Sequence, residues 1–448
     1  MGSSYQVYIH VPFCMRRCGY CDFNTYTASD LGGGASREHY ADLAIREMRM
    51  VRDWQTSRGL IEPPVSTIFF GGGTPTILPA QDLARMVEAV ADLWGLSPDA
   101  EVTTEANPDT VDRAYLEQLL RGGINRVSFG MQSAVPSVLA TLDRTHTPAN
   151  VTTDVAAAKD LGLRASVDLI YGTPGERLED WHTSLQAVLD LGVDHVSAYA
   201  LTLEPTTKMG RAVRRGQLPA PDDDDEATKY EMADDMLSQA GLCWYEISNW
   251  ARSGQESRHN LGYWHNVDWA GIGPGAHSHY RGLNGQDTGM ALMKEIREQE
   301  PMPSVSPGFR ATGTATAEEA APGARWWLSP EPGLGERRAR AIRSWDIAHP
   351  RDWAAAMDAG LVPWQDAELL GWMQDLEETV MLALRLHEGL GLDRLTRLAG
   401  RPADPKILKD LVDQGLLLPV HDRIQVTRRG RLLNDLVIDQ VLEAVGIR

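Results

Sequence analysis

Three cysteines stand within eight residues near the start of the chain, in the segment HVPFCMRRCGYCDFN (10–24). Cys14, Cys18 and Cys21 are a poor disulfide set, because three is an odd number and such close neighbours make strained loops. A tetrahedral zinc site usually needs a fourth ligand. Thiolates are the normal ligands of iron–sulfur clusters, and three of them on a cluster of four irons leave one iron without a protein ligand. The spacing therefore favours a 4Fe–4S cluster with one iron open to a small molecule.

The bulk composition excludes several classes of protein. The chain has 448 residues, enough for two or three domains, and its formal net charge of −19 argues against broad nucleic-acid or anionic-membrane binding. The first ten residues lack the charged and apolar regions of a secretory signal, and no apolar run approaches the roughly 18 residues of a membrane span. Four cysteines, three of them clustered, suit a reducing compartment. We therefore expect a cytoplasmic protein with no transmembrane segment and no nucleic-acid partner.

Short apolar runs alternate with amphipathic stretches through the first half of the chain, which is the pattern of βα units and a parallel sheet. Strands are predicted at 5–10, 65–70, 101–105, 126–129, 165–170 and 195–201. The helices predicted between them include 79–94, 112–121, 149–161 and 178–191. Six repeats predict an α/β fold, an incomplete (β/α)6 barrel of the TIM type. In such barrels the functional residues lie at the C-terminal ends of the strands, and the cysteines directly follow the first predicted strand.

Changes in composition divide the chain into four predicted segments. They are the barrel (1–240), a barrel extension (241–300), a flexible insertion rich in Pro, Ala and Gly (301–345), and a small C-terminal domain (346–448). The C-terminal domain is predicted to be mostly helical and winged-helix-like, with a hairpin in LLLPVHDRIQVT (416–427). Residues 373–448 contain 11 Lys and Arg and 12 Asp and Glu. This segment therefore lacks the excess of positive charge that is typical of nucleic-acid-binding domains.

The spacing Cys14-x3-Cys18-x2-Cys21 resembles that of the radical S-adenosylmethionine (SAM) superfamily. The glycine run GGGTP (71–75) follows an apolar strand and stands where that superfamily holds the amino group of SAM. The resemblance implies that the amino and carboxylate groups of SAM bind the open iron. It also implies that an electron from the cluster cleaves the sulfonium, so that an electron donor is a partner whenever SAM is cleaved.

Further motifs resemble the oxygen-independent coproporphyrinogen oxidase family. They are YIHVPFC (8–14), FGGGTPT (70–76), EANP (105–108), GMQS (130–133) and DLIYGTPG (168–175). The resemblance runs from about residue 5 to 280 and resumes in the C-terminal domain. It implies contacts to SAM from eight residues: Tyr8, Gly72, Gly73, Thr74, Glu105, Gln132, Arg144 and Asp168. Glu105 and Asp168 can accept hydrogen bonds from ribose hydroxyls or the ammonium, and Arg144 can pair with the carboxylate.

Two departures separate the chain from the oxidases of that family. Phe23 stands where they have a further cysteine, and the chain has no N-terminal arm ahead of the YIHVPFC motif. Both departures, and the motif HNLGYW (259–264), resemble the oxidase-like branch known as HemW, which is thought to act as a haem chaperone. The resemblance implies a protein that binds haem and passes it to an acceptor protein. The alternatives are a coproporphyrinogen III dehydrogenase and a radical enzyme with another substrate.

His259 is the predicted haem ligand, because histidine is the commonest protein ligand of haem iron. Tyr263 and Trp264 can cover a face of the ring. The alternative is that His259 only hydrogen-bonds a loop. Weaker candidates for the ligand are His265, His277 and His279. Cys243 is expected to be a buried core cysteine outside the cluster, and GIGPGAHS (271–278) is expected to form a turn beside SAM.

Overall fold

The computed structural model describes residues 4–281 and 340–447. Within these residues one twelve-stranded sheet has the order β12-β11-β10-β9-β1-β2-β3-β4-β5-β6-β8-β7. Its strands are β1 (Tyr5–Val11), β2 (Val65–Gly72), β3 (Leu96–Ala106), β4 (Arg126–Gln132), β5 (Arg164–Tyr171), β6 (His195–Ala200), β7 (Cys243–Glu246), β8 (Asn249–Ala251), β9 (Asp268–Ile272), β10 (His277–Arg281), β11 (Ala341–Asp346) and β12 (Trp364–Leu370).

Strands β1 to β6 pair in parallel in sequence order, and β9 pairs in parallel with β1. The sheet curves but does not close, since antiparallel strands continue it at both ends. Each parallel strand is followed by a helix or a loop with a helix, as right-handed βα crossovers require. The predicted incomplete α/β barrel and its six strands are therefore confirmed.

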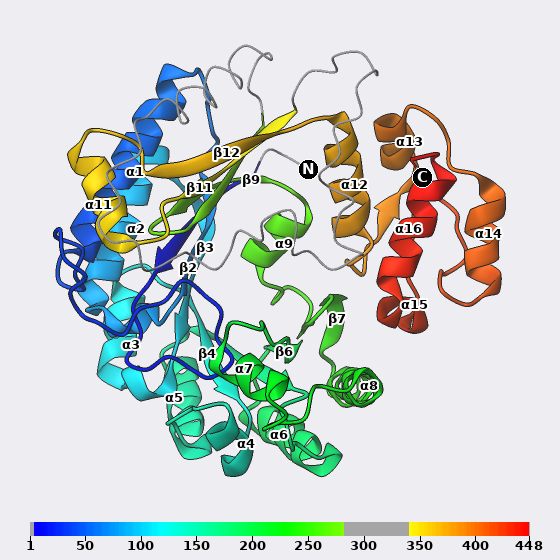
Figure 1. Ribbon diagram of the computed structural model, residues 1–448, viewed down its shortest axis with the longest axis horizontal. Helices are drawn as coiled ribbons and strands as arrows, with labels where there is room; N and C mark the ends of the chain where they lie inside the picture. Colours follow the sequence, from blue (N-terminus) through cyan, green and yellow to red (C-terminus); the bar gives the residue numbers. More distant parts are fainter. Residues whose placement is uncertain (1–3, 282–339, 448) are drawn as a thin grey trace.

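The helices lie along the outer side of the curved sheet, and α9 lies on its inner side (Figure 1). Those of the barrel are α1 (Tyr40–Ser57), α2 (Ala80–Trp94), α3 (Arg113–Arg121), α4 (Pro136–Thr141), α5 (Pro148–Asp160), α6 (Leu178–Leu191), α7 (Lys208–Arg214), α8 (Asp223–Gln239), α9 (Arg258–Trp264) and α11 (Pro350–Asp358). No helix in the described ranges has both the length and the apolar character needed to cross a bilayer.

Strand β4 shows how the sequence builds the two faces of the sheet. Val127, Phe129 and Met131 are buried in the hydrophobic core, whereas the alternate residues Arg126 and Ser128 border an internal cavity. This alternation follows from the two-residue period of a strand. The outer face is therefore apolar and holds the helices, and the inner face is polar.

The region after residue 240 differs from the predicted segments. Residues 341–370 carry β11 and β12, which extend the main sheet, so the predicted boundary at residue 346 cuts through the end of one sheet strand. Residues 341–345 of the predicted insertion belong to β11, and 301–339 lie outside the described residues. The strand signal was missed because the antiparallel strands of this region are short and lack βα alternation.

The C-terminal helices gather at one end of the molecule (Figure 1). They are α12 (Trp372–Ala383), α13 (Leu392–Ala399), α14 (Pro405–Asp413), α15 (Arg428–Leu432) and α16 (Asn434–Ala444). The predicted hairpin at 416–427 is present, because Leu417 and Val426 form an antiparallel bridge. Its second arm continues the short pair of β13 (Leu390–Gly391) with β14 (Arg423–Ile424). The domain is therefore mostly helical with a small wing, as predicted.

A buried pair of carboxyl groups joins α1 to the far end of the sheet. Glu47 is fully buried, and its Oε2 accepts hydrogen bonds from the Gly273 amide (2.7 Å) and the Trp353 indole (3.1 Å). Burial raises the pKa of Glu47 to about 7, and burial beside Glu47 raises that of Asp346 well above its usual range. Two carboxyl groups this close are stable only while a proton is retained.

We expect Glu47→Gln to change how stability depends on pH. A raised folded-state pKa gives stability that is present below pH 4.5 and lost as pH rises to about 7. Relative to wild type, the free energy of unfolding of the variant should therefore rise over this window, by up to about 1 kcal/mol per pH unit. Denaturant unfolding at several pH values measures this, with Glu38→Gln at an exposed site as the control. Parallel curves for Glu47→Gln and wild type would contradict it.

Candidate functional site

A cavity of about 520 Å³ opens at the carboxyl ends of the parallel strands and extends inward between them. The loop that carries the clustered cysteines forms one wall, the glycine run after β2 forms another, and the inner faces of β3 to β6 form the floor. Cys14, Cys18 and Cys21 all border this one space. The cavity is therefore where the predicted site residues should meet.

The cysteine loop is held in place by its own backbone and by the strands beside it. The Cys14 amide donates to the Tyr26 carbonyl (2.9 Å), and the Tyr26 amide donates to the Pro12 carbonyl (2.7 Å). Burial raises the pKa of the Cys14 thiol and raises that of Cys21 to about 11. These thiols are therefore protonated in the free protein, and binding a metal group releases protons.

Two polar side chains contact the sulfur atoms from other elements. The Thr74 hydroxyl donates to the Cys14 sulfur at 3.7 Å, and Nη1 of Arg144 donates to the Cys18 sulfur at 3.6 Å. In the described part of the chain no three His, Cys, Asp or Glu side chains are placed to share a single metal ion. A cluster differs from a single ion in this respect, because each thiolate binds a different iron.

The glycine run lies against the backbone of the cysteine loop. The Gly73 amide donates to the Val11 carbonyl and the Thr74 amide donates to the Phe13 carbonyl, both at 2.8 Å. A Cβ at position 73 would lie 2.6 Å from the Phe13 carbonyl oxygen, so only glycine fits there. Gly72 has a φ of +103°, which also favours glycine. The run therefore packs tightly against the cysteine loop and fixes it beside the cavity that both segments border.

Two half-buried carboxyl groups face the cavity from β3 and β5, the strands on either side of β4. Glu105 accepts the Gly72 amide (3.2 Å), and Asp168 accepts the Ser128 hydroxyl (2.9 Å to Oδ2). Burial, reinforced by the nearby Asp168, raises the pKa of Glu105 to about 8. Burial also raises the pKa of Asp168. A cationic ligand would favour the charged forms of both groups, so this wall suits an ammonium or sulfonium group.

Gln132 and Arg144 complete the outer part of the site. Gln132 has a φ of +61°, an uncommon conformation for a residue other than glycine, and its side chain borders the cavity. Nη2 of Arg144 donates to the Gly130 carbonyl at 2.8 Å, which orients the guanidinium along the cavity wall. Seven of the eight residues predicted to contact SAM border the cavity: Gly72, Gly73, Thr74, Glu105, Gln132, Arg144 and Asp168.

The eighth, Tyr8, is not among the described residues that line the cavity. Its hydroxyl hydrogen-bonds Nδ1 of His10 at 3.0 Å, and its ring stacks on Phe69, which does border the cavity. Cys243 was expected in the core, but it is exposed at the start of β7, so that expectation is wrong. The edge strand β7 turns this small residue outward and buries Trp244 and Tyr245 instead.

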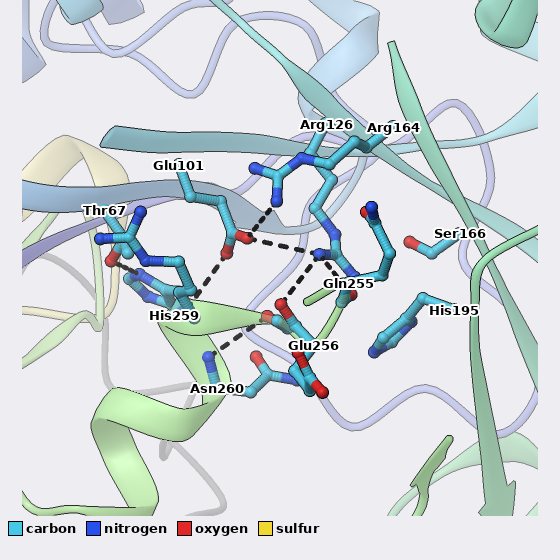
Figure 2. Close-up of polar contacts among 12 residues, drawn as sticks. Thr67, Glu101, Arg126, Arg164, Ser166, His195, Gln255, Glu256, His259 and Asn260 are labelled. Atoms are coloured by element: carbon cyan, nitrogen blue, oxygen red, sulfur yellow. Dashed lines mark hydrogen bonds and ion pairs between the residues drawn. The ribbon is translucent and has the colours of Figure 1, made fainter. Parts of the chain in front are cut away.

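His259 lies on α9 behind the cavity wall (Figure 2). It is 1 % exposed, and both ring nitrogens have hydroxyl partners, Thr67 on Nδ1 (2.7 Å) and Tyr263 on Nε2 (2.9 Å). Burial lowers the pKa of His259 to about 3, so the imidazole is neutral. The next residue, Asn260, borders the cavity itself. The turn at 271–278 does not line the cavity among the described residues, and packs against Asn24 of the cysteine loop.

Several polar residues of the site were not predicted. They are Thr103, Asn107, Arg126, Ser128, Ser166, His195 and Ser197. Most stand two residues apart on a predicted strand, for example at 126 and 128 on β4 and at 195 and 197 on β6. In a parallel sheet covered on both sides, strands normally read as continuous apolar runs. Polar residues at every second position were thus the available signal of an internal polar cavity.

Comparison with known sequences agrees with this geometry. The Radical SAM superfamily matches residues 8–188, and the HemN C-terminal domain matches residues 374–433. The Heme chaperone HemW of Mycobacterium tuberculosis (strain ATCC 25618 / H37Rv) is 40 % identical over 443 residues, covering 98 % of this chain and 95 % of that protein. The chain belongs to the HemW family of radical SAM proteins.

A second full-length relative shares fewer residues with the chain. The Heme chaperone HemW of Bacillus subtilis is 29 % identical over 440 residues, which cover 97 % of this chain and 98 % of that protein. Among solved structures, the coproporphyrinogen III oxidase HemN of Escherichia coli aligns with a TM-score of 0.71 at 19 % identity, covering 99 % of this chain and 90 % of that one. At this identity the likeness shows a shared fold.

Radical SAM family membership implies a 4Fe–4S cluster and SAM, and the residues present fit both groups. Three thiols border one cavity, two of them with polar partners, and the glycine run at 72–74 borders the same cavity. Nε of Arg144 is buried without a hydrogen-bond partner among the described residues. A buried, unpaired donor is costly unless a ligand accepts from it, so the cavity wall is prepared for a polar ligand.

We expect Cys14→Ala, Cys18→Ala and Cys21→Ala each to lose the cluster, because the remaining two thiolates cannot hold four irons in place. Cys243→Ala is the matched control, since this thiol is exposed on β7, which does not line the cavity. Iron and sulfide contents after anaerobic reconstitution, together with the visible absorption, measure the result. Loss of the cluster in Cys243→Ala but not in Cys18→Ala would contradict the assignment.

We expect Gly73→Ala to weaken SAM binding by at least about tenfold. The added methyl group would meet backbone oxygens of the cysteine loop, so the loop or the glycine run must shift. Isothermal titration with SAM on the reconstituted protein measures the loss. Gly34→Ala serves as the control, because a Cβ there meets nothing within 4 Å, although its positive φ makes a small stability cost. Equal SAM affinity in Gly73→Ala and wild type would show that the glycine run does not contribute to SAM binding.

Proposed function

We propose that this protein is a haem chaperone, which carries a 4Fe–4S cluster and SAM, binds haem and passes it to an acceptor protein. The observation that carries the proposal is the 40 % identity to proteins named Heme chaperone HemW over 98 % of the chain. The acceptor and the electron donor are partner proteins in this proposal, and the site of action is the cytoplasm.

Cys14, Cys18 and Cys21 would hold the cluster, and the cavity wall from Gly72 to Thr74 would hold the methionine part of SAM. The cluster supplies an electron to SAM when both are bound. Glu105 and Asp168 would compensate the positive charges of SAM, and each would release its proton when a cation approaches. Arg144 would bind the carboxylate of SAM with the donor that is unpaired in the free protein.

Haem would bind against the same cavity, whose lining includes large apolar side chains that are exposed. Phe23, at the position where oxidases of the family have a cysteine, lines the cavity and is 58 % exposed. Exposed large apolar side chains at a cavity are typical of ligand-binding surfaces. His259 is the proposed iron ligand. Nε2 would become available when the Tyr263 hydroxyl releases it and the side chains that bury the imidazole move aside.

The competing proposal is a coproporphyrinogen III dehydrogenase, which the shared fold with HemN of Escherichia coli allows. A titration of the reconstituted protein with haem, followed by anaerobic incubation with SAM, a reductant and coproporphyrinogen III, separates the two. A chaperone should shift the haem Soret band and form no protoporphyrinogen IX. Sustained formation of protoporphyrinogen IX in step with SAM cleavage would show that the protein is a dehydrogenase. Absence of haem binding would contradict the chaperone proposal.

We expect His259→Ala to weaken haem binding by at least about tenfold or to change the Soret spectrum, and to leave the cluster intact. Tyr263→Phe is the informative companion, because it removes the hydroxyl that occupies Nε2. If His259 binds the iron, Tyr263→Phe should bind haem at least as tightly as wild type. Haem titrations of both variants measure this. Unchanged haem affinity and spectrum in His259→Ala would show that another residue binds the iron, and His265, His277 and His279 would be tested next.

A further inference from the structure

The inner end of the cavity contains an ion-pair arrangement of residues that are not assigned above to the cluster or to SAM. Glu101 is fully buried, and its Oε2 pairs with Nη1 of Arg126 (3.3 Å) and with Nη1 of Arg164 (3.4 Å) (Figure 2). One carboxylate thus faces two guanidinium groups. Arg164 is 32 % exposed and has access to solvent, whereas Arg126 is 3 % exposed and borders the cavity. Within this ion pair the two guanidinium groups outnumber the one carboxylate, and Asp168 faces the same cavity from β5.

Arg126 uses only part of its donor capacity on the protein. Nη1 donates to the carbonyls of Gln255 (3.0 Å) and Glu256 (3.2 Å) and pairs with Glu101. A guanidinium has five N–H donors, and no buried nitrogen of Arg126 is left unpaired in the described residues. The remaining N–H donors of Arg126, on Nε and Nη2, therefore face the cavity that the side chain borders.

Two further polar groups at the same depth have no partner. The Thr103 hydroxyl and Nδ1 of His195 are buried without a hydrogen bond in the described chain, and both residues border the cavity. Burial, together with Arg126, holds the pKa of His195 well below its usual range, so the ring is neutral. The Tyr245 hydroxyl lies 2.8 Å from Nε2 and can donate to it, which leaves the ring proton on Nδ1. Buried donors without partners indicate a missing acceptor.

We propose that Arg126, His195 and Thr103 form a carboxylate receptor at the inner end of the cavity, and that its ligand is a propionate group of the bound haem. A carboxylate offers two acceptor oxygens and one negative charge, which match a guanidinium fork with two further donors. Asn260 of the HNLGYW motif borders the same space from α9. The receptor thus joins the barrel floor to the helix that carries His259. The identity of the ligand rests on the haem binding proposed above.

The test compares haem with haem dimethyl ester, which has no free carboxylate, in the reconstituted full-length protein. Wild type should bind haem at least about tenfold more tightly than the ester. Arg126→Gln should bind haem about as weakly as wild type binds the ester and should no longer discriminate. Thr103→Val should reduce the discrimination without loss of stability, because its hydroxyl has no partner to lose. Arg164→Gln, which alters the same ion pair away from the cavity, should discriminate like wild type.

Equal binding of haem and ester by wild type, or full discrimination in Arg126→Gln and Thr103→Val, would overturn the receptor while leaving haem binding in place. A second measurement uses no haem, so that failure of the haem proposal does not decide the receptor. Sodium propionate should raise the melting temperature of wild type relative to propionamide at equal ionic strength, and should not do so in Arg126→Gln. No effect of propionate would overturn the receptor. Protection by propionate without discrimination against the ester would overturn its assignment to haem.

Discussion

The inner face of the parallel strands is polar although it is enclosed, and the rest of the molecule follows from this constraint. Burying polar and charged groups costs free energy unless they find partners. Across β3 to β6 the partners come from the neighbouring strand, as with Ser128 and Asp168, or from the ion pair of Glu101 with Arg126. The outer face compensates by being largely apolar, which fixes the strand register, because a one-residue slip would exchange the two faces.

The same constraint explains why the barrel is open. A closed barrel of this size fills its interior with side chains. Here antiparallel strands continue the sheet on both sides of the parallel block, β10 to β12 beyond β9 and β8 with β7 beyond β6, and α9 covers the inner side. The interior therefore keeps a cavity of about 520 Å³ that ligands can occupy. The cysteine loop then needs only the carboxyl ends of β1 and β2, to which Gly73 ties it directly.

The parallel strands and most of the candidate site were predictable from the sequence, because their signals lie in short stretches of the chain. The six parallel strands and the cysteine loop have strong signals in βα alternation and in cysteine spacing, and seven of the eight residues carried over from the resemblance meet in one cavity. Strands β7 to β12, most of which pair antiparallel, have no such signal, because they lack the regular βα alternation. The surroundings of His259 were not predictable either, because Thr67 lies 192 positions away and approaches only through the β2–α9 contact.

The ion pair of Glu101 with two arginines also limits how the sequence can change over time. Loss of Glu101 alone would leave Arg126 buried without its counter-charge, and loss of Arg126 alone would leave the carboxylate with only Arg164 and the His259 amide. Positions 101, 126 and 164 should therefore change together in descendants of this protein. Position 164 should vary first, because it is partly exposed and the other two are not.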